Sequence, residues 1–263
     1  MTTSTNAAPV KATELLRLHA DPALLTVVNV WDVVSARVVA GVAGTTALAT
    51  ASHSIAASYG YPDGEKIPLD LMIEAVGRIA AAVAQPVSAD LEGGYGDAAE
   101  TIRRAIGVGI VGANLEDQLK PLSEAAAAVA AAVSAAQAEG VGDFVLNART
   151  DVFVKAGDRD PAEVLADAVE RGRAYLDAGA PVVFVPGKLD ERQIGTLVDA
   201  FGPQRLTVIG VPGSVPLARL QELGVARCSY GPWSQRVALT ALEDLVHAVH
   251  GGGGLPAGTR PLN

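Results

Sequence analysis

The stretch Pro86-Val87-Ser88-Ala89-Asp90-Leu91-Glu92-Gly93-Gly94-Tyr95-Gly96 joins a short apolar run to a glycine-rich turn, and a helical stretch follows it. The apolar run is typical of a buried strand and ends in two carboxylates one residue apart. Residues i and i+2 of an extended segment point to the same side, so Asp90 and Glu92 are predicted to aim at one spot. Buried carboxylates are costly unless they are paired or bind a metal. This segment therefore predicts a strand, a turn and a helix, with a cation site where the strand ends.

The same unit recurs along the chain, because eight apolar runs alternate with longer, mostly alanine-rich amphipathic stretches. The predicted strands are residues 25–30, 45–50, 86–90, 111–115, 144–147, 182–185, 206–209 and 226–229. The predicted helices are residues 33–42, 69–84, 98–107, 123–139, 161–178, 191–200, 216–223 and 234–250, with an extra helix at about 10–20.

This alternation predicts a parallel sheet, and eight repeats in a chain of 263 residues are typical of a (β/α)8 TIM-type barrel. The near-continuous apolar strands fit a sheet covered on both faces. An open doubly wound sheet is the alternative, but no Gly-x-Gly-x-x-Gly motif follows the first strand. We expect a single domain over residues 1–263, with a flexible tail at 251–263.

Composition narrows the functional classes. The net charge of −9 argues against non-specific binding to nucleic acid, and no apolar run approaches the roughly 20 residues of a membrane span. The single cysteine, Cys228, excludes an internal disulfide, and residues 1–9 lack the features of a signal peptide. A cytoplasmic protein with no membrane or nucleic-acid partner is predicted.

Polar residues gather at the predicted strand ends, where barrels of this kind carry their active sites. Four acids and one arginine are expected to meet there: Asp63, Asp90, Glu92, Glu116 and Arg149. Carboxylates suit Mg²⁺, with Mn²⁺ as a further possibility, and an arginine offers a planar fork for a carboxylate or phosphonate. Backbone amides near Ser52 and His53 could bind a second anionic oxygen. A small anionic substrate such as an α-keto acid is predicted.

Several of these residues also have structural interpretations. Glu116 could cap a helix or be solvated, and Arg149 could pair with Asp151 or Glu116. His53 fits a loop histidine, and Asp63 lies in an ordinary turn composition. Asp97 is expected to cap the following helix.

Taken in order, seven segments resemble the isocitrate lyase/phosphoenolpyruvate mutase superfamily. They are Ser35–Arg37, Ser58–Gly64, Ala89–Gly96, Gly112–Asp117, Asn147–Asp151, Phe184–Gly187 and Leu223–Arg227. The resemblance implies a (β/α)8 barrel whose last helix is swapped with a neighbouring subunit, in a homodimer or homotetramer.

The resemblance also implies a site. Mg²⁺ would be held by Asp90, Glu92 and Glu116, largely through water. Arg149 would bind the substrate, the Ser52 region would hold its carboxylate, and Asp63 would lie near the reacting bond. Members make or break C–C or P–C bonds next to an α-keto acid, through metal-stabilised enolates or related intermediates.

Two departures from the family pattern bear on activity. Lyases of the superfamily carry a Lys-(Lys/Arg)-Cys-Gly-His loop, whereas here Gln118-Leu119-Lys120-Pro121-Leu122-Ser123 runs straight into a helix. The family pattern usually has a second aspartate at the position of Glu92.

Our leading hypothesis is a Mg²⁺-dependent enzyme that cleaves a C–C bond of a small α-keto or α-hydroxy diacid, by a lyase or decarboxylase route. Asp63, Glu116 and Arg149 are the candidate catalytic residues, and Ser52, His53, Asp90 and Arg149 the candidate substrate-binding residues. The alternatives are a phosphonate P–C bond enzyme, such as a phosphonopyruvate hydrolase or a phosphoenolpyruvate mutase, and a non-catalytic barrel that binds keto acids.

Overall fold

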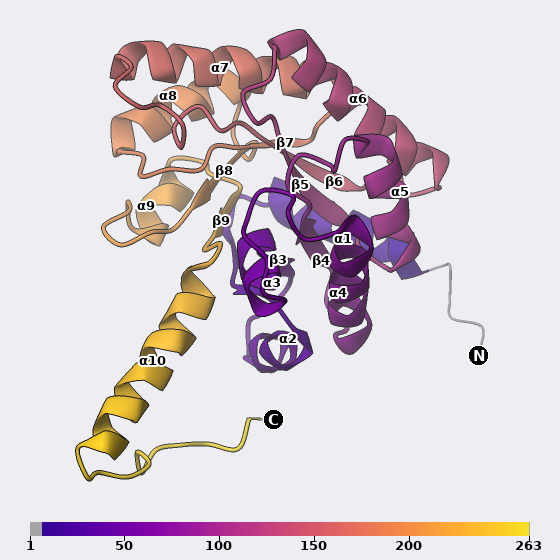
Figure 1. Ribbon diagram of the computed structural model, residues 1–263. Helices are drawn as coiled ribbons and strands as arrows, with labels where there is room; N and C mark the ends of the chain where they lie inside the picture. Colours follow the sequence, from indigo (N-terminus) through magenta and orange to yellow (C-terminus); the bar gives the residue numbers. More distant parts are fainter. Residues whose placement is uncertain (1–6, 263) are drawn as a thin grey trace.

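The computed structural model describes residues 7–262 and forms one parallel barrel with helices around its outside (Figure 1). The strands are β1 (Leu25–Val27), β2 (Asn29–Val30), β3 (Leu48–Thr50), β4 (Val87–Asp90), β5 (Gly112–Glu116), β6 (Val145–Arg149), β7 (Val182–Phe184), β8 (Leu206–Ile209) and β9 (Arg227–Ser229). The helices are α1 (Ala7–Ala20), α2 (Val33–Ala40), α3 (Ser52–Ser58), α4 (Leu69–Ala82), α5 (Ala98–Gly107), α6 (Leu122–Ala138), α7 (Pro161–Asp177), α8 (Glu191–Phe201), α9 (Leu217–Glu222) and α10 (Trp233–His250).

The barrel closes through its first strand. The predicted strand at residues 25–30 is wrong as a single element, because β1 pairs with β9 whereas β2 pairs with β3. Val28, between the two halves, is 40% exposed, and there the chain passes from one neighbour to the other. The two ends of the sheet are therefore consecutive pieces of one segment. This confirms the (β/α)8 class and excludes the open sheet.

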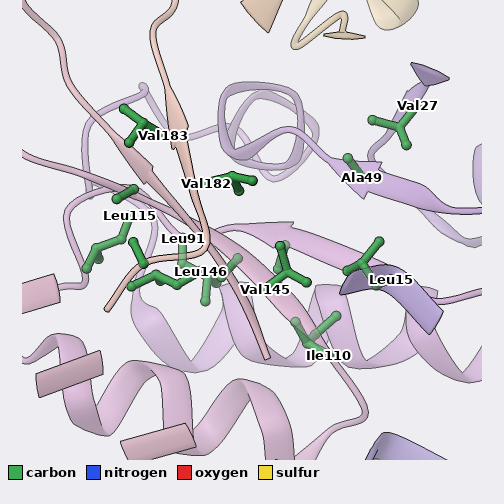
Figure 2. Close-up of a cluster of buried hydrophobic side chains, with 14 of the residues drawn as sticks. Leu15, Val27, Ala49, Leu91, Ile110, Leu115, Val145, Leu146, Val182 and Val183 are labelled. Carbon is green, nitrogen blue, oxygen red and sulfur yellow. The ribbon is translucent and has the colours of Figure 1, made fainter. Parts of the chain in front are cut away.

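Apolar side chains fill the barrel wall and the space beneath its helices (Figure 2). Leu15 of α1 is fully buried, and it packs so tightly on β5 that a Cβ added to Gly112 would lie 2.8 Å from its Cδ2 atom. Burying a leucine side chain of this kind contributes about 2 kcal/mol. The predicted extra helix is thus real, begins at Ala7, and covers the amino-terminal ends of the strands.

Helix α3 is a correction to the sequence analysis, which predicted no helix between the second strand and residue 69. Its N-cap residue is Ala51, which has no side-chain oxygen to accept a hydrogen bond, so the usual signal for a helix start is missing. The helix forms because Ser52, Ser54, Ile55 and Ala56 are buried against the barrel. As a result the backbone N–H of Ser52 points toward Asp90, in the mouth of the barrel, where the carboxyl ends of the strands meet.

Helix α10 extends away from the barrel in Figure 1, and Gln235 is its one buried residue. Large apolar side chains along it are exposed, among them Leu242 and Val246. The helix ends at His250, where the predicted tail begins. Within residues 7–262, no helix combines the length and hydrophobicity needed to cross a membrane.

Candidate active site

The register of the sheet brings Glu116 and Arg149 to the same height on neighbouring strands. Arg149 Nη1 lies 2.9 Å from Glu116 Oε2, and Arg149 Nε donates to Asp151 Oδ1 at 2.8 Å. The guanidinium also lies 6.0 Å from the centre of the Phe184 ring, within range of a cation–π contact. Both pairings that sequence analysis had offered for this arginine are present. They fix the guanidinium plane at the carboxyl end of β6.

Asp90 lies at the end of β4, the strand next to β5, and is held there by α3. Its Oδ2 atom accepts hydrogen bonds from Ser52 Oγ at 2.7 Å and from the backbone N–H of Ser52 at 3.0 Å. The backbone N–H of Asp90 donates to Thr50 Oγ1 at 2.9 Å. The second carboxylate oxygen, Oδ1, is buried and has no hydrogen-bond partner in the described part of the chain. A buried carboxylate oxygen in that state needs a cation or an ordered water.

Glu92 reaches the mouth by a route that the sequence did not indicate. Strand β4 ends at Asp90, and Glu92 lies beyond it with φ of 53°, in the left-handed region. The extended i, i+2 geometry therefore does not apply to this pair. The carboxylate of Glu92 accepts from the backbone N–H of Glu65, and the Tyr95 hydroxyl donates to its Oε1 atom at 3.3 Å.

Burial and mutual repulsion raise the proton affinity of these acids. Burial, with Asp90 and Asp63 as nearby negative charges, raises the pKa of Glu92 to about 7, although the Glu65 N–H opposes the change. Burial also raises the pKa of Glu116 to about 7; Arg149 opposes this, and Asp151 and Asp90 add to it. Burial alone would lower the pKa of Arg149, but Glu116 and Asp151 outweigh it and raise the pKa. The mouth thus holds more negative charge on its carboxylates than Arg149 neutralises.

The donor set fits a hard divalent cation bound through water. Carboxylate oxygens are the ligands that Mg²⁺ and Mn²⁺ prefer, and Mg²⁺ usually keeps several waters. Asp90 Oδ1 is a free buried acceptor of the right type. Within residues 7–262, however, no three side chains of His, Cys, Asp or Glu are arranged to coordinate one ion directly. Ser52, Glu65 and Arg149 each hold one of the three acids, which keeps them apart.

A small cavity borders this cluster. It has a volume of about 20 Å³ and is lined by residues that include Glu116, Arg149, Asp117 and Tyr175. Since a buried water requires roughly 10–15 Å³, the cavity has room for a single water molecule. An ordered water next to Glu116 and Arg149 is therefore sterically allowed.

Two candidate residues, Asp63 and His53, make fewer contacts with the rest of the site. Asp63 is exposed on the segment between α3 and α4, and its carboxylate makes no hydrogen bond to another described residue, although its charge acts on Glu92. His53 lies on α3, and its Nδ1 atom is buried without a hydrogen-bond partner among the described residues. The structure therefore brings Ser52, Asp90, Glu92, Glu116 and Arg149 together more tightly than these two.

Asp117, next to Glu116, is an anchor that sequence analysis did not identify. Its Oδ2 atom accepts from Tyr175 at 2.7 Å and Arg171 at 3.1 Å, and its Oδ1 atom accepts from the backbone N–H groups of Asp151 and Leu119, both at 3.0 Å. Burial would raise the pKa of Asp117, but these donors outweigh it and hold the pKa below its ordinary value. No sequence signal marks the role, because the donors come from residues 151, 171 and 175.

The shortened loop after Glu116 is tightly folded. Gln118 and Leu119 both have positive φ, and α6 begins already at Leu122. The Gln118 side chain packs against Gly93, where an added Cβ would lie 2.5 Å from Nε2, so any larger residue there would displace the end of the Gln118 side chain. Asp97 caps α5 by accepting from the backbone N–H of Glu100, as expected.

Comparisons with known proteins agree with this architecture. The sequence profile of the phosphoenolpyruvate phosphomutase family matches residues 15–250. An uncharacterised protein of Mycobacterium tuberculosis strain H37Rv is 32% identical over 91% of this chain and 90% of its own. The 2,3-dimethylmalate lyase of Eubacterium barkeri is 27% identical over 81% of this chain and 77% of its own.

Solved structures give the same result. A protein from Burkholderia cenocepacia J2315, provisionally described as a phosphonomutase, superposes with a TM-score of 0.85 and 42% identity over 91% of this chain and 98% of its own. An oxaloacetate acetylhydrolase in complex with oxalate superposes with a TM-score of 0.84 and 26% identity over 97% of this chain and 92% of its own. This chain belongs to the phosphoenolpyruvate phosphomutase family, within the isocitrate lyase/phosphoenolpyruvate mutase superfamily. It is an enzyme of the lyase and mutase class.

Proposed function

We propose that this enzyme requires Mg²⁺, or Mn²⁺ in its place, and cleaves a C–C bond of a small α-keto or α-hydroxy diacid by a lyase or decarboxylase route. The observation that carries the proposal is the buried Oδ1 atom of Asp90, which has no hydrogen-bond partner among residues 7–262 and lies in a mouth where burial raises the pKa of Glu92 and Glu116. Related enzymes named for such chemistry support it, including the oxaloacetate decarboxylase of Pseudomonas savastanoi pv. phaseolicola, 29% identical over 82% of this chain.

Arg149 is proposed to bind the substrate carboxylate. A guanidinium carries five N–H donors. Three are directed at protein carboxylates, namely Nη1 at Glu116, and Nε and Nη2 at Asp151, which leaves two for a substrate. Because the protein contacts hold the guanidinium plane, little side-chain entropy would be lost when a substrate binds.

Asp90, Glu92 and Glu116 are proposed to hold the cation, largely through water, with Ser52 orienting Asp90. The cation, when bound, would neutralise the acids and stabilise negative charge on a keto or enolate oxygen. Glu116 has a pKa near 7 in the metal-free protein, the range in which a carboxyl group can both accept and donate a proton. Asp63, on the segment next to Glu92, is the second candidate for proton transfer.

The test is a calorimetric titration with Mg²⁺, followed by turnover assays with oxaloacetate and other keto diacids. We expect Mg²⁺ to bind, at least one diacid to be consumed, and EDTA to abolish turnover. Asp90→Asn should lose both binding and turnover, whereas Asp97→Asn, which affects the cap of α5, should retain both. Full turnover by Asp90→Asn would overturn the site assignment.

A phosphonate P–C bond enzyme is the second candidate. It is favoured by the 42% identity to the B. cenocepacia protein and by the family profile itself. The two free donors of Arg149 suit a phosphonate as well as a carboxylate. Phosphate release from phosphonopyruvate, without consumption of keto diacids, would decide for this candidate.

We also propose that α10 packs on a second copy of the chain, in a homodimer or homotetramer. Leu239, Leu242, Val246 and Val249 are between 44% and 55% exposed and recur every three or four residues, so they form one unpartnered apolar stripe. A groove of about 630 Å³ lies beside the base of α10 and is lined by residues that include Val28, Trp31, Val34 and Val38. The stripe and the groove have matching apolar character, and isolated patches of this kind mark interfaces.

Light scattering of the full-length protein tests this assembly. Wild type should have the mass of two or four chains, and Leu242→Asp with Val246→Asp should shift it to one chain. Val10→Asp, at an exposed apolar residue on α1, is the matched control and should leave the mass unchanged. A monomeric wild type would overturn the proposal.

A further inference from the structure

Backbone strain in this molecule is concentrated at the mouth of the barrel. Among residues 7–262, six residues other than glycine have positive φ, and five of them lie on the three segments that meet there: Glu65, Glu92, Tyr95, Gln118 and Leu119. Residues with side chains persist in this conformation only when their surroundings determine it, and such residues cluster at functional sites. Specific contacts must therefore hold Glu65, Glu92 and Tyr95 in this conformation.

Glu65, Glu92 and Tyr95 form a closed ring of hydrogen bonds. The backbone N–H of Glu65 donates to the Glu92 carboxylate, and the Tyr95 hydroxyl donates to the same carboxylate at 3.3 Å. The backbone N–H of Tyr95 in turn donates to Glu65 Oε1 at 2.6 Å. Each of the three residues contacts the other two, and all three have φ between 53° and 60°.

This ring joins two segments that are separate in the sequence. Glu65 lies on the connection between α3 and α4, and Glu92 and Tyr95 lie on the turn between β4 and α5. Asp63 precedes Glu65 by two residues and is exposed, whereas Ile67 follows it by two residues and is fully buried. The connection is thus fastened by Ile67 on one side and by Tyr61, which packs on the core and donates to Ala56, on the other. Glu65 is the contact between these two anchors that lies next to Asp63.

We propose that Glu65 is a positioning residue, which fixes Asp63 over the mouth and sets the direction of the Glu92 carboxylate. The proposal rests on the proposed function, since Asp63 and Glu92 matter only if the mouth is the active site. Glu65 itself reaches neither the cation nor the substrate. It acts through the two hydrogen bonds that tie the α3–α4 connection to the β4–α5 turn.

The variants Glu65→Gln and Glu65→Ala separate this role from a general loss of folding. Glutamine retains the oxygen that accepts from the Tyr95 N–H, whereas alanine removes it, and both retain the backbone N–H that donates to Glu92. Asp70→Ala is the matched control, because Asp70 is an exposed acid five residues further along, and Arg104 is its one ion-pair partner among the described residues.

Hydrogen–deuterium exchange of the metal-free protein gives the first readout. Glu65→Ala should exchange about tenfold faster at Tyr95 and across residues 61–66, because the contacts that close these amides are lost. Glu65→Gln and Asp70→Ala should exchange as wild type does. If Glu65→Ala exchanges like wild type, or Glu65→Gln like alanine, the proposal is overturned.

Turnover with Mg²⁺ gives the second readout. Glu65→Ala should lower kcat about 100-fold, with KM nearly unchanged, because Asp63 is misplaced while Arg149 still binds the substrate. Glu65→Gln should restore most of kcat. A wild-type protein that binds no Mg²⁺ and consumes no keto diacid would refute the proposed function, while the exchange measurement would still decide whether Glu65 fastens the segment.

Discussion

Glu116 and Asp117 are adjacent in the chain and both largely buried, yet their surroundings are opposite. Asp117 accepts four hydrogen bonds, two from side chains on α7 and two from the backbone, and its pKa is lowered. Glu116 has one charged partner, Arg149, and its pKa is raised to about 7. A satisfied carboxylate stabilises the fold, whereas an under-satisfied one keeps capacity for a ligand or a proton.

The comparison extends to the regions around the two residues. The Asp117 region ties the ends of β5 and β6 to α7, and each charge in it has a partner. The mouth region, with Asp90, Glu92 and Glu116, has more negative charge than Arg149 can offset. The strained residues Glu65 and Glu92 and the unpartnered Oδ1 atom of Asp90 therefore lie where chemistry is proposed, whereas the Asp117 carboxylate, one residue from Glu116, is fully hydrogen-bonded.

The largest expected effect is on folding, from the replacement of Asp117. Asp117→Ala should lower the free energy of unfolding by about 3–5 kcal/mol, because the Tyr175 hydroxyl and two backbone N–H groups lose their acceptor and Arg171 retains only Asp167 as a carboxylate partner. Urea unfolding followed by circular dichroism measures this. The same measurement on Asp70→Ala, an exposed pair, should show a change of less than about 0.5 kcal/mol. A small effect at Asp117 would remove the contrast between the two regions.

Glu116→Gln should have the opposite effects to Asp117→Ala: turnover should fall while stability is kept. The free energy of unfolding at pH 8 should stay equal or rise, because a neutral amide replaces an acid whose charged form is disfavoured there. Turnover should fall about 100-fold, since one charged group of the site is lost. Unfolding and turnover measured on the same preparation test both parts. A destabilised but fully active variant would contradict the assignment.

The dependence of stability on pH should come from the two acids of the mouth whose pKa values are raised, Glu92 and Glu116. Glu92 and Glu116 have folded-state pKa values of about 7, above the ordinary value of 4.5. Between these two pH values the folded protein retains protons that the unfolded chain has released, so the free energy of unfolding falls as pH rises. Without metal, Tm should drop by about 5 °C from pH 5 to pH 8. Glu92→Gln with Glu116→Gln should remove most of that drop.

Added Mg²⁺ should oppose the fall in Tm, because a cation favours ionised carboxylates. The stabilisation produced by Mg²⁺ should therefore be small at pH 5 and larger at pH 8. Differential scanning fluorimetry over this range measures it. Equal stabilisation at both pH values would mean that the ion binds elsewhere.

The smallest expected effect comes from Ser52. Ser52→Ala removes the hydroxyl that donates to Asp90 Oδ2, but the backbone N–H of residue 52 still donates to the same atom. Mg²⁺ affinity should fall by about 1 kcal/mol, or roughly fivefold, and the fold should be unaffected. Calorimetry compares this variant with Ser58→Ala, which loses a hydrogen bond within α3 and should bind Mg²⁺ as wild type does.

Much of the fold could be predicted from the sequence, since the alternation of apolar runs with helices follows from local periodicity. Of the ten helices that the structure describes within residues 7–262, all but α3 lie close to their predicted ranges, and α3 escapes prediction because Ala51 gives no capping signal. The break at Val28 could not be predicted either, because it depends on tertiary pairing: β1 pairs with β9, whereas β2 pairs with β3.

The sequence by itself determined which chemical groups stand at the strand ends, because an apolar run that stops at a carboxylate sets the position of that carboxylate along the barrel axis. Asp90, Glu116 and Arg149 follow from this rule. Tertiary structure alone decided how each group is held: Asp90 by Ser52, Glu92 by Glu65, and Asp117 by α7. These partners lie between 27 and 58 residues apart in the sequence, and only closure of the barrel brings them within hydrogen-bond distance.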